Sequence, residues 1–349
     1  MSEQNAEMSA PTMQLNFKKK TTIKKDKGII KLARKIVEKK EVENIETSTT
    51  TDDSPVQAAT TTRKPRAKSK MAVSKAVMPL VFIDTSYFIF YRYHATKAWY
   101  LHSKKEDESG DLTIENEGFV ENYSKHFGQW RAKISKKFGV PEDQFYWFRD
   151  SPKETVWRTP LFAGYKATRD EKCPEGIDGF FKYTYDNLIP GDRQILVEAA
   201  EADDAVAVAA QYENEHRPEQ KVVIITADTD YLQLVNDVTR VVKLPNFDDI
   251  PLVVKSGKEK ITVTPKEYLI TKVILGDTAD EIPKVYSGCG PATALSISRD
   301  EDTFKRLIED HPERLEKFHN NLTLISFNKI PKEVRERCQL AYLLVRGIV

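Results

Sequence analysis

Short apolar runs alternate with longer helical patterns from Pro79 onward, and this alternation constrains the fold more than any other feature. Five of the runs have the length of buried strands. They are Leu80–Ile83, Phe145–Phe148, Ile195–Val197, Val222–Ile225 and Val241–Leu244. The clearest helical patterns between them cover residues 119–138 and 202–215. This order predicts an α/β fold, in which right-handed crossovers build a mostly parallel central sheet with helices on both faces.

The first 78 residues differ from the rest in charge and composition. They carry 17 Lys and Arg against 9 Asp and Glu, a net charge of +8, whereas residues 79–349 carry a net charge of −7. The segment holds one aromatic residue, so it cannot bury enough apolar surface to offset about 1–2 kcal/mol of ordering entropy per residue. We expect a disordered basic tail over residues 1–78. Within it, residues 29–37 could form a fluctuating helix or a docking element, and residues 63–68 a nuclear address or a loose phosphate-binding arm.

Several classes of protein are excluded by what the sequence lacks. No run approaches the roughly 18 apolar residues of a membrane span, and the start has no signal-peptide core. The three cysteines lie too far apart for a zinc knuckle or a disulfide framework. The six histidines are scattered, and Walker A spacing does not occur. We therefore expect an intracellular, reduced protein with no membrane partner, in either the nucleus or the cytoplasm.

Acidic residues follow the predicted strands, and two more follow an apolar helix that ends at Gly276. In parallel sheets, chemistry gathers beyond the carboxyl ends of the strands, so we expect the acids to share one site. They are Asp84, Asp150, Glu201, Asp203, Asp204, Asp228, Asp230, Asp277 and Asp280.

Each of these acids has a structural alternative, because an Asp after a strand often caps a helix, an effect of about 1 kcal/mol. The group as a whole is harder to explain in that way. Two unit charges about 4 Å apart repel by roughly 4 kcal/mol at an effective dielectric constant near 20, so clustered carboxylates need cations. Oxygen ligands without His or Cys favour Mg²⁺ or Mn²⁺ over zinc. Two such ions about 3.5–4 Å apart suit phosphodiester hydrolysis.

Seven motifs occur in order over residues 80 to about 330, and together they carry a resemblance to one family. They are Val81–Asp84, Phe148–Asp150, Tyr165-Lys166-x-x-Arg169, Glu201–Asp204, Thr226–Asp230, Leu275–Pro283 and Gly288–Ala294. The chain thereby resembles the flap endonuclease and 5′-3′ exonuclease superfamily, whose nuclease core is a PIN-like fold. Trp157-Arg158 and residues 321–327 resemble segments of the RNase H of T-even phages, so a viral or phage-encoded chain is compatible with the sequence.

The resemblance implies a metal-dependent 5′-3′ exonuclease or flap endonuclease with two Mg²⁺ ions, for which Mn²⁺ can substitute. One ion would be surrounded by Asp84, Asp150, Glu201 and Asp203, and the other by Asp228, Asp230, Asp277 and Asp280, with Asp204 at its margin. The implied substrates are DNA with a 5′ end or flap and RNA primers in RNA–DNA hybrids. We expect a monomer that acts in primer removal or repair, with replication proteins as further partners.

Residues 151–185 interleave Lys and Arg with aromatic residues. One interpretation is an arch or channel over the metals, in which cations hold phosphates and aromatic faces stack bases at roughly 1–3 kcal/mol each. The other is an amphipathic helical connection whose aromatic residues face the core. The resemblance assigns polarisation of the scissile phosphate to Lys166 and Arg169, stacking on the terminal base to Tyr165, and a DNA contact to Arg158.

A glycine turn follows the last acids. Gly288 and Gly290 would let the backbone approach a phosphate, and a helix starting near Pro291 would offer free N–H groups. The resemblance implies a helix-turn-helix variant that grips duplex DNA, with Thr293 in its first turn, and that holds K⁺. Ala292 stands where the family usually has Lys, and Lys284 where it has Gly, which puts one phosphate contact and the K⁺ site in question. The alternative is a plain connecting turn.

These features divide the chain into the tail, a nuclease core over residues 79–275 that includes the arch, and a helix-turn-helix DNA-binding module with C-terminal helices over residues 276–349. A competing hypothesis is a catalytically silent DNA-binding or scaffold relative of the same fold. Such a relative would be expected to have lost a metal ligand, whereas every motif position here carries Asp or Glu. A small PIN-type ribonuclease is disfavoured, because it would lack the arch and the glycine turn.

Overall fold

The computed structural model describes residues 77–103, 112–168 and 173–349. The chain divides into two units, residues 1–72 and residues 73–349. Apart from Val77 and Met78, the predicted basic tail lies outside the described residues, as does Arg169.

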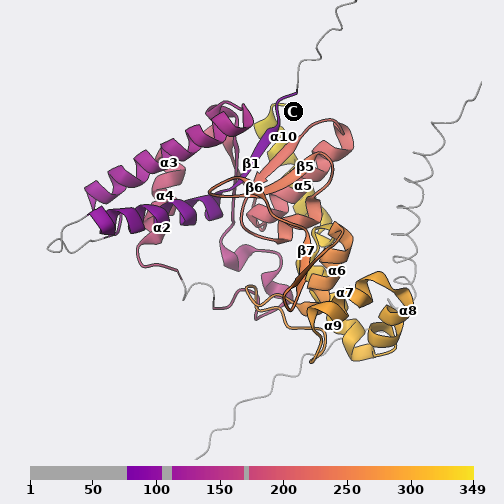
Figure 1. Cartoon of the computed structure of the whole chain (residues 1–349). Coiled ribbons are helices and arrows are strands. Elements are labelled where there is room, and N and C mark those ends of the chain that lie inside the picture. The colour runs from indigo at the N-terminus through magenta and orange to yellow at the C-terminus, as the bar shows by residue number, and fades with distance from the viewer. Residues whose placement is uncertain (1–76, 104–111, 169–172) are drawn as a thin grey trace, which may run out of the picture. The chain divides into compact units, whose positions relative to one another are not determined.

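A mainly parallel sheet forms the centre of the second unit (Figure 1). Its strand order is β3-β2-β1-β4-β5-β6, and all neighbours pair in parallel except β5 and β6. The strands are β1 (Leu80–Asp84), β2 (Tyr146–Arg149), β3 (Gln194–Leu196), β4 (Val222–Ile225), β5 (Thr239–Lys243) and β6 (Asp248–Asp249). The predicted α/β fold class is therefore confirmed, and the expected strand ends differ from the observed ones by at most two residues.

Helices connect these strands and continue beyond them. The helices near the sheet are α2 (Thr85–Ser103), α3 (Glu117–Phe138), α4 (Ile177–Asn187) and α5 (Ala202–His216). The later elements are the hairpin β7 (Val253–Ser256) and β8 (Glu259–Thr262), then α6 (Pro265–Leu275), α7 (Pro291–Arg299), α8 (Glu301–Phe304), α9 (Pro312–Ile325) and α10 (Lys332–Arg346). The helices expected at residues 119–138 and 202–215 are present. None of the helices in the described ranges is long and apolar enough to cross a bilayer.

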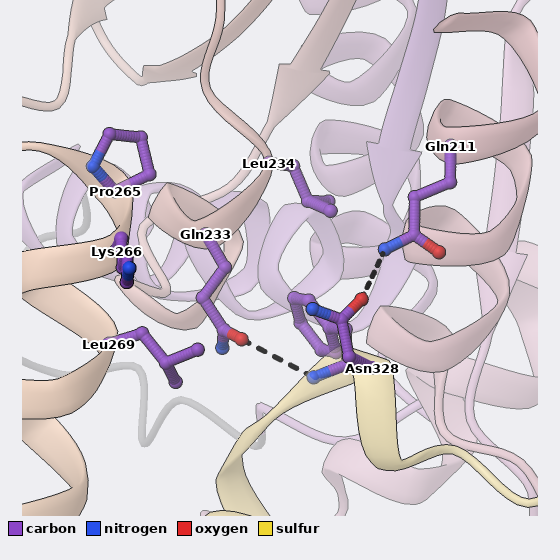
Figure 2. A pocket seen from close by; sticks show the side chains of 8 residues that line it. Gln211, Gln233, Leu234, Pro265, Lys266, Leu269 and Asn328 are labelled. Atoms are coloured by element: carbon purple, nitrogen blue, oxygen red, sulfur yellow. Dashed lines mark hydrogen bonds between the residues drawn. The ribbon is translucent and has the colours of Figure 1, made fainter. Parts of the chain in front are cut away.

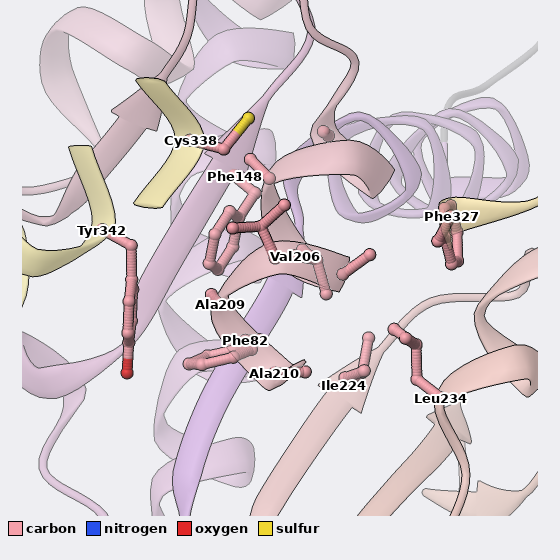
Figure 3. Close-up of a cluster of buried hydrophobic side chains, with 14 of the residues drawn as sticks. Phe82, Phe148, Val206, Ala209, Ala210, Ile224, Leu234, Phe327, Cys338 and Tyr342 are labelled. Atoms are coloured by element: carbon pink, nitrogen blue, oxygen red, sulfur yellow. The ribbon is translucent and has the colours of Figure 1, made fainter. Parts of the chain in front are cut away.

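The alternation of side chains along β1 divides the core into two faces. Leu80 and Phe82 belong to the cluster that packs against α5 and α10 (Figure 3). Val81 and Ile83 belong to the cluster on the other face, under α2 and α3. Since successive side chains of a strand point to opposite faces, a wholly apolar strand needs a cover on both, and the helices supply it.

A third cluster lies among α6, α7 and α9, and includes Val273, Ala294 and Phe318. The last helix does not belong to it, because Cys338 and Tyr342 of α10 pack in the cluster over the sheet. The predicted boundary at residue 275 had placed α10 with the C-terminal module. The pair α6–α7 does flank a glycine turn, but its identity as a helix-turn-helix DNA-binding module stays a prediction.

The segment expected to form an arch is helical only in part. It contains 3₁₀ turns at Lys153–Thr155 and Thr159–Leu161, and a regular helix only from α4 onward. Its aromatic side chains Trp157, Tyr165 and Phe180 are buried, one in each of the three clusters. For these three residues, the structure favours the interpretation in which the aromatic residues face the core.

Candidate metal centre

The carboxyl ends of the parallel strands bring acids from distant parts of the chain into one hollow. Asp84 is the last residue of β1, and Asp150 directly follows β2. The hollow has a volume of about 240 Å³. Its lining includes five of the nine predicted acids and one of the predicted cations, namely Asp84, Asp150, Glu201, Asp203, Asp228 and Lys166.

Three acids at the start of α5 form what we call the first carboxylate group, Glu201, Asp203 and Asp204. Each offers an oxygen, and these oxygens lie within 4.8 Å of one another. Arg158 compensates their charge, because its guanidinium donates to both oxygens of Asp204, at 2.7 and 2.9 Å, and to Glu201 at 2.8 Å. Burial by itself lowers the pKa of Arg158, but Asp204, Asp203 and Glu201 together raise it well above its usual range.

Arg158 and Asp204 are both buried, with exposed fractions of 1% and 0%. The Arg158 Nε also donates to the backbone oxygen of Leu324 at 2.8 Å. Arg158 therefore has no surface to offer to DNA, and the predicted DNA contact is wrong for this structure. Asp204 also accepts from the indole of Trp157 and from the backbone N–H of Glu201. Its oxygens are thus engaged inside the protein, which fits a supporting role better than metal ligation.

Glu201 is the member of this group that faces the predicted catalytic cation. Its carboxylate accepts from Lys166 Nζ at 2.6 Å and from the Tyr165 hydroxyl at 2.7 Å. Burial raises the pKa of Glu201, but Lys166 and Arg158 outweigh it and lower the pKa to about 2. Tyr165 is only 4% exposed, so the expected stacking on a terminal base does not fit this structure either. The phenol instead holds Glu201 in place.

Asp230, Asp277 and Asp280 form what we call the second carboxylate group, and their ligand oxygens also lie within 4.8 Å of one another. Lys272 of α6 pairs with Asp230 and, at 2.7 Å, with Asp277. Lys166 Nζ lies 3.7 Å from Asp280. Lys166 therefore contacts a carboxylate of each group, which places its ammonium between the two.

A tight loop positions the acids of the second group that follow α6. Asp277 and Ile282 exchange two backbone hydrogen bonds, of 2.9 and 2.7 Å, across this loop. Gly276 enters it with φ of +69°, and a Cβ atom there would lie 2.3 Å from the backbone oxygen of Ile282. Only glycine fits that close approach, so Gly276 is required for the placement of Asp277.

Glu281 is a residue of this loop that the sequence analysis missed. Its carboxylate accepts from the backbone N–H groups of Ala167, at 2.8 Å, and Thr168, at 3.2 Å. Its φ of +62° is unusual for a residue with a side chain. The contact ties the segment that carries Lys166 to the loop that carries Asp280. In the motif Asp280-x-Ile282 it occupied the variable position, so no sequence signal pointed to it.

Asp84 and Asp150 combine the capping role and the candidate ligand role. Asp84 accepts from the backbone N–H of Tyr87 at 3.1 Å, and Asp150 accepts from that of Ala202, the first residue of α5, at 2.8 Å. Burial, followed by repulsion from Asp150, raises the pKa of Asp84 to about 7. Burial also raises the pKa of Asp203 well above its usual range, against the effect of Arg158. Such raised values are expected where clustered carboxylates are to bind a cation.

The glycine turn lies at the start of α7. Gly288 has φ of +77°, Gly290 is the residue before the helix, and Thr293 is exposed in the first turn. Lys284 donates to the backbone oxygen of Cys289 at 3.2 Å. The turn thus presents a helix N-terminus with a lysine ammonium beside it.

A second hollow, of about 310 Å³, lies between α5, α6 and the segment after α9 (Figure 2). Its described lining is Gln211, Gln233, Leu234, Pro265, Lys266, Leu269, Phe327 and Asn328. Because no acid stands among these eight residues, the hollow at the strand ends is the stronger candidate for chemistry.

The donor atoms of both carboxylate groups fit a hard divalent ion. The two groups supply carboxylate oxygens alone. Such ligands suit Mg²⁺, Mn²⁺ or Ca²⁺, and not a soft metal that prefers sulfur. The site could therefore hold divalent ions, and the geometry alone does not select one of them.

Known proteins resemble this chain in sequence and in fold. The sequence model of the family described as 5′-3′ exonuclease, N-terminal resolvase-like domain, matches residues 79–269. DNA polymerase I of Mycobacterium leprae is 32% identical over 159 residues, which cover 44% of this chain and 17% of the polymerase. A 5′-3′ exonuclease of Halalkalibacterium halodurans is 25% identical over 233 residues, which cover 65% of this chain and 74% of that protein.

Among solved structures, a bacteriophage T5 flap endonuclease in complex with DNA and metal ions superposes with a TM-score of 0.54 and 17% sequence identity. The match covers 77% of this chain and 99% of the phage protein. At this level of identity, the likeness shows a common fold.

Proposed function

This chain belongs to the family of 5′-3′ exonucleases with an N-terminal resolvase-like domain, and on that premise we propose that it is a divalent-metal-dependent, structure-specific 5′ nuclease. It hydrolyses phosphodiester bonds of DNA as a 5′-3′ exonuclease or flap endonuclease. The observation that carries the proposal is the pair of carboxylate groups at one edge of the sheet, with the Lys166 ammonium in contact with both.

In this proposal the strand ends hold two metal ions. Asp84, Asp150, Glu201 and Asp203 bind one of them, and Asp228, Asp230, Asp277 and Asp280 bind the other. When bound, the ions supply a water of lowered pKa and stabilise charge on the leaving oxygen. The proposed cofactor is Mg²⁺, and Mn²⁺ can substitute because it prefers the same oxygen ligands.

The remaining residues of the site support or complete these ligands. Arg158, Asp204 and Tyr165 hold Glu201 from the protein side. Lys166 donates to Glu201 in the structure and contacts a carboxylate of each group, so it can turn to a phosphate once the carboxylates are neutralised by ions. Its charge then stabilises the extra negative charge that develops on the phosphate during cleavage. Arg169 is proposed to assist from the segment outside the described residues.

The substrate proposal is DNA with a 5′ end or flap, bound partly at the start of α7. Gly288, Gly290 and Thr293 lie where backbone N–H groups at a helix N-terminus can bind a phosphate. Lys284 supplies at this turn the positive charge that K⁺ would otherwise supply. RNA–DNA hybrids as substrates, replication proteins as partners and action as a monomer belong to the same proposal.

A cleavage assay with end-labelled 5′-flap, nicked and single-stranded substrates tests the function. We expect Mg²⁺-dependent release of short 5′ products, and their lengths separate exonuclease from flap cutting. Asp150→Asn and Asp228→Asn should each abolish cleavage. Both residues are exposed, so the changes should not disturb the fold, and DNA binding should remain. Asp237→Asn, an exposed change away from the hollow, is the matched control.

Two outcomes would count against the proposal. Undiminished cleavage in EDTA, or full activity of either variant, would reject the metal assignment. A protein that binds flap DNA but leaves it uncut with Mg²⁺ and with Mn²⁺ would instead fit the silent DNA-binding relative.

A further inference from the structure

One lysine of α6, Lys272, contacts the second carboxylate group. Lys272 lies in the last turn of that helix, and its side chain is only 13% exposed. Its ammonium pairs with Asp230 and with Asp277, so it contacts two of the three acids whose oxygens converge there. Sequence motifs did not single it out, because it stands four residues before Gly276 and outside all seven motifs.

The position of this ammonium matters because a divalent ion would use the same oxygens. Asp230 is 8% exposed and has few other sources of positive charge, since Lys166 reaches this group only at Asp280. When no ion is bound, Lys272 is the cation that keeps Asp230 and Asp277 from repelling each other. When an ion approaches, two positive charges compete for the same carboxylates.

At the first carboxylate group an ammonium meets a single acid, because Lys166 donates to Glu201. Arg158 binds Asp204 with two parallel hydrogen bonds and sits behind Glu201, inside the protein. Lys272 instead carries a point charge on a flexible side chain. Its ammonium can move away from the carboxylates without breaking a bidentate pair of hydrogen bonds. The two groups therefore differ in how many of their acids an ammonium meets. Lys272 pairs with two acids of the second group and Lys166 lies beside the third, whereas in the first group Lys166 contacts Glu201.

We propose that Lys272 is a built-in counter-ion of the second carboxylate group that competes with the divalent ion bound there, so that this ion binds more weakly than the one at the first group. The proposal rests on the two-ion function proposed above. Its consequence is sequential loading, in which the first ion is held at low metal concentration and the second enters only when it displaces the ammonium.

Titration of the full chain with Mn²⁺, followed by the electron paramagnetic resonance signal of free Mn²⁺, tests the competition without reference to activity. In Lys272→Met we expect the weaker ion to bind about tenfold or more tightly, the size of effect that one nearby charge has on a partly buried carboxyl. The affinity of the tighter ion should not change. Lys272→Arg keeps the charge and should keep the weak affinity, and Lys266→Met, an exposed change on the same helix, is the matched control.

Lys272→Gln is a second variant, because a neutral side chain that can still donate is less disruptive if Lys272→Met folds poorly. Thermal unfolding with and without Mn²⁺ gives an independent measurement, and both variants should gain more stability from the ion than the unmodified chain does. Second-site affinity that is unchanged or weaker in both variants would overturn the inference. The nuclease proposal is judged separately by cleavage with the unmodified chain, so an active enzyme whose variants show no tighter binding rejects this inference alone.

Discussion

The two carboxylate groups both contact Lys166 but are built in opposite ways. The first begins helix α5, and its charge is balanced by the buried guanidinium of Arg158, which also reaches the backbone of Leu324. The second joins Asp230, which follows β4, to two acids of the loop after α6, and its main counter-charge is the ammonium of Lys272. The first group is thus held by a cation buried in the protein, whereas the second is paired with a lysine that a metal ion can displace in the proposal above.

This difference shows that clustered acids can be stabilised for two purposes. The buried Arg158 makes bidentate hydrogen bonds to Asp204, and they fix the position of Asp204 and of the start of α5. A lysine neutralises acids without fixing them in one geometry. We therefore expect the first group to govern stability and the second to govern the response to metal ions.

The largest expected effect comes from removing Arg158. Arg158→Met leaves Asp204 buried without its partner, so we expect a loss of about 3–5 kcal/mol in the free energy of unfolding. Urea unfolding measures it, with Arg337→Met as an exposed control. Saturating Mn²⁺ should not restore this stability, because Asp204 points to the protein interior. If Mn²⁺ stabilised Arg158→Met as much as it stabilises Lys272→Met, the two carboxylate groups would not differ in the way proposed here.

A smaller effect is expected from Glu281, which joins the Lys166 segment to the second group. Glu281→Ala removes the acceptor for Ala167 and Thr168 and should lower kcat about 10- to 100-fold through misplacement of Lys166, with little change in KM. Glu281→Gln should recover part of the loss, and Glu316→Ala serves as an exposed control. A variant that is less stable but keeps its kcat would reduce Glu281 to a purely structural residue.

The smallest expected effect concerns pH and tests whether the first strand end also binds metal. Burial and Asp150 raise the pKa of Asp84 from 3.8 to about 7. The folded protein therefore keeps a proton that the unfolded chain releases near pH 4, and the stability due to Asp84 is lost as pH rises through about 7. A divalent ion must displace that proton, so its affinity should be about fourfold weaker at pH 6.5 than at pH 8.

Mn²⁺ titrations at the two pH values measure this change. Asp84→Asn cannot take up the proton, so its weaker binding should vary less over this range, and Asp203, whose pKa is also raised, accounts for what variation remains. An affinity of the unmodified chain that is constant from pH 6.5 to 8 would mean that Asp84 is not a ligand.

Much of the fold could be predicted because it depends on local patterns. The runs around Phe82 and Ile224 are apolar on both faces, as parallel strands covered by helices must be. The acids at the strand ends could be predicted for the same reason, since parallel strands bring their carboxyl ends to one edge. The predicted boundary at residue 275 stays a prediction. The contact of α10 with α5 could not be predicted, because a helix at the end of the chain carries no local sign of where it packs.

The roles of the cations depended on contacts that no local pattern encodes. Arg158 stands among aromatic and basic residues, which in sequence is typical of a DNA-binding surface. Its partners Asp204 and Leu324 are 46 and 166 residues away, and they draw it into the interior. Tyr165 is also buried rather than exposed to DNA, because its hydroxyl donates a hydrogen bond to Glu201.

The sequence by itself determined the layered α/β architecture and the set of acids at its edge, because hydrophobic periodicity and strand polarity act over a few residues. Only the tertiary structure decided which cation faces which acid. An ion pair depends on the distance between groups far apart in the chain, and on how much water the fold leaves around them.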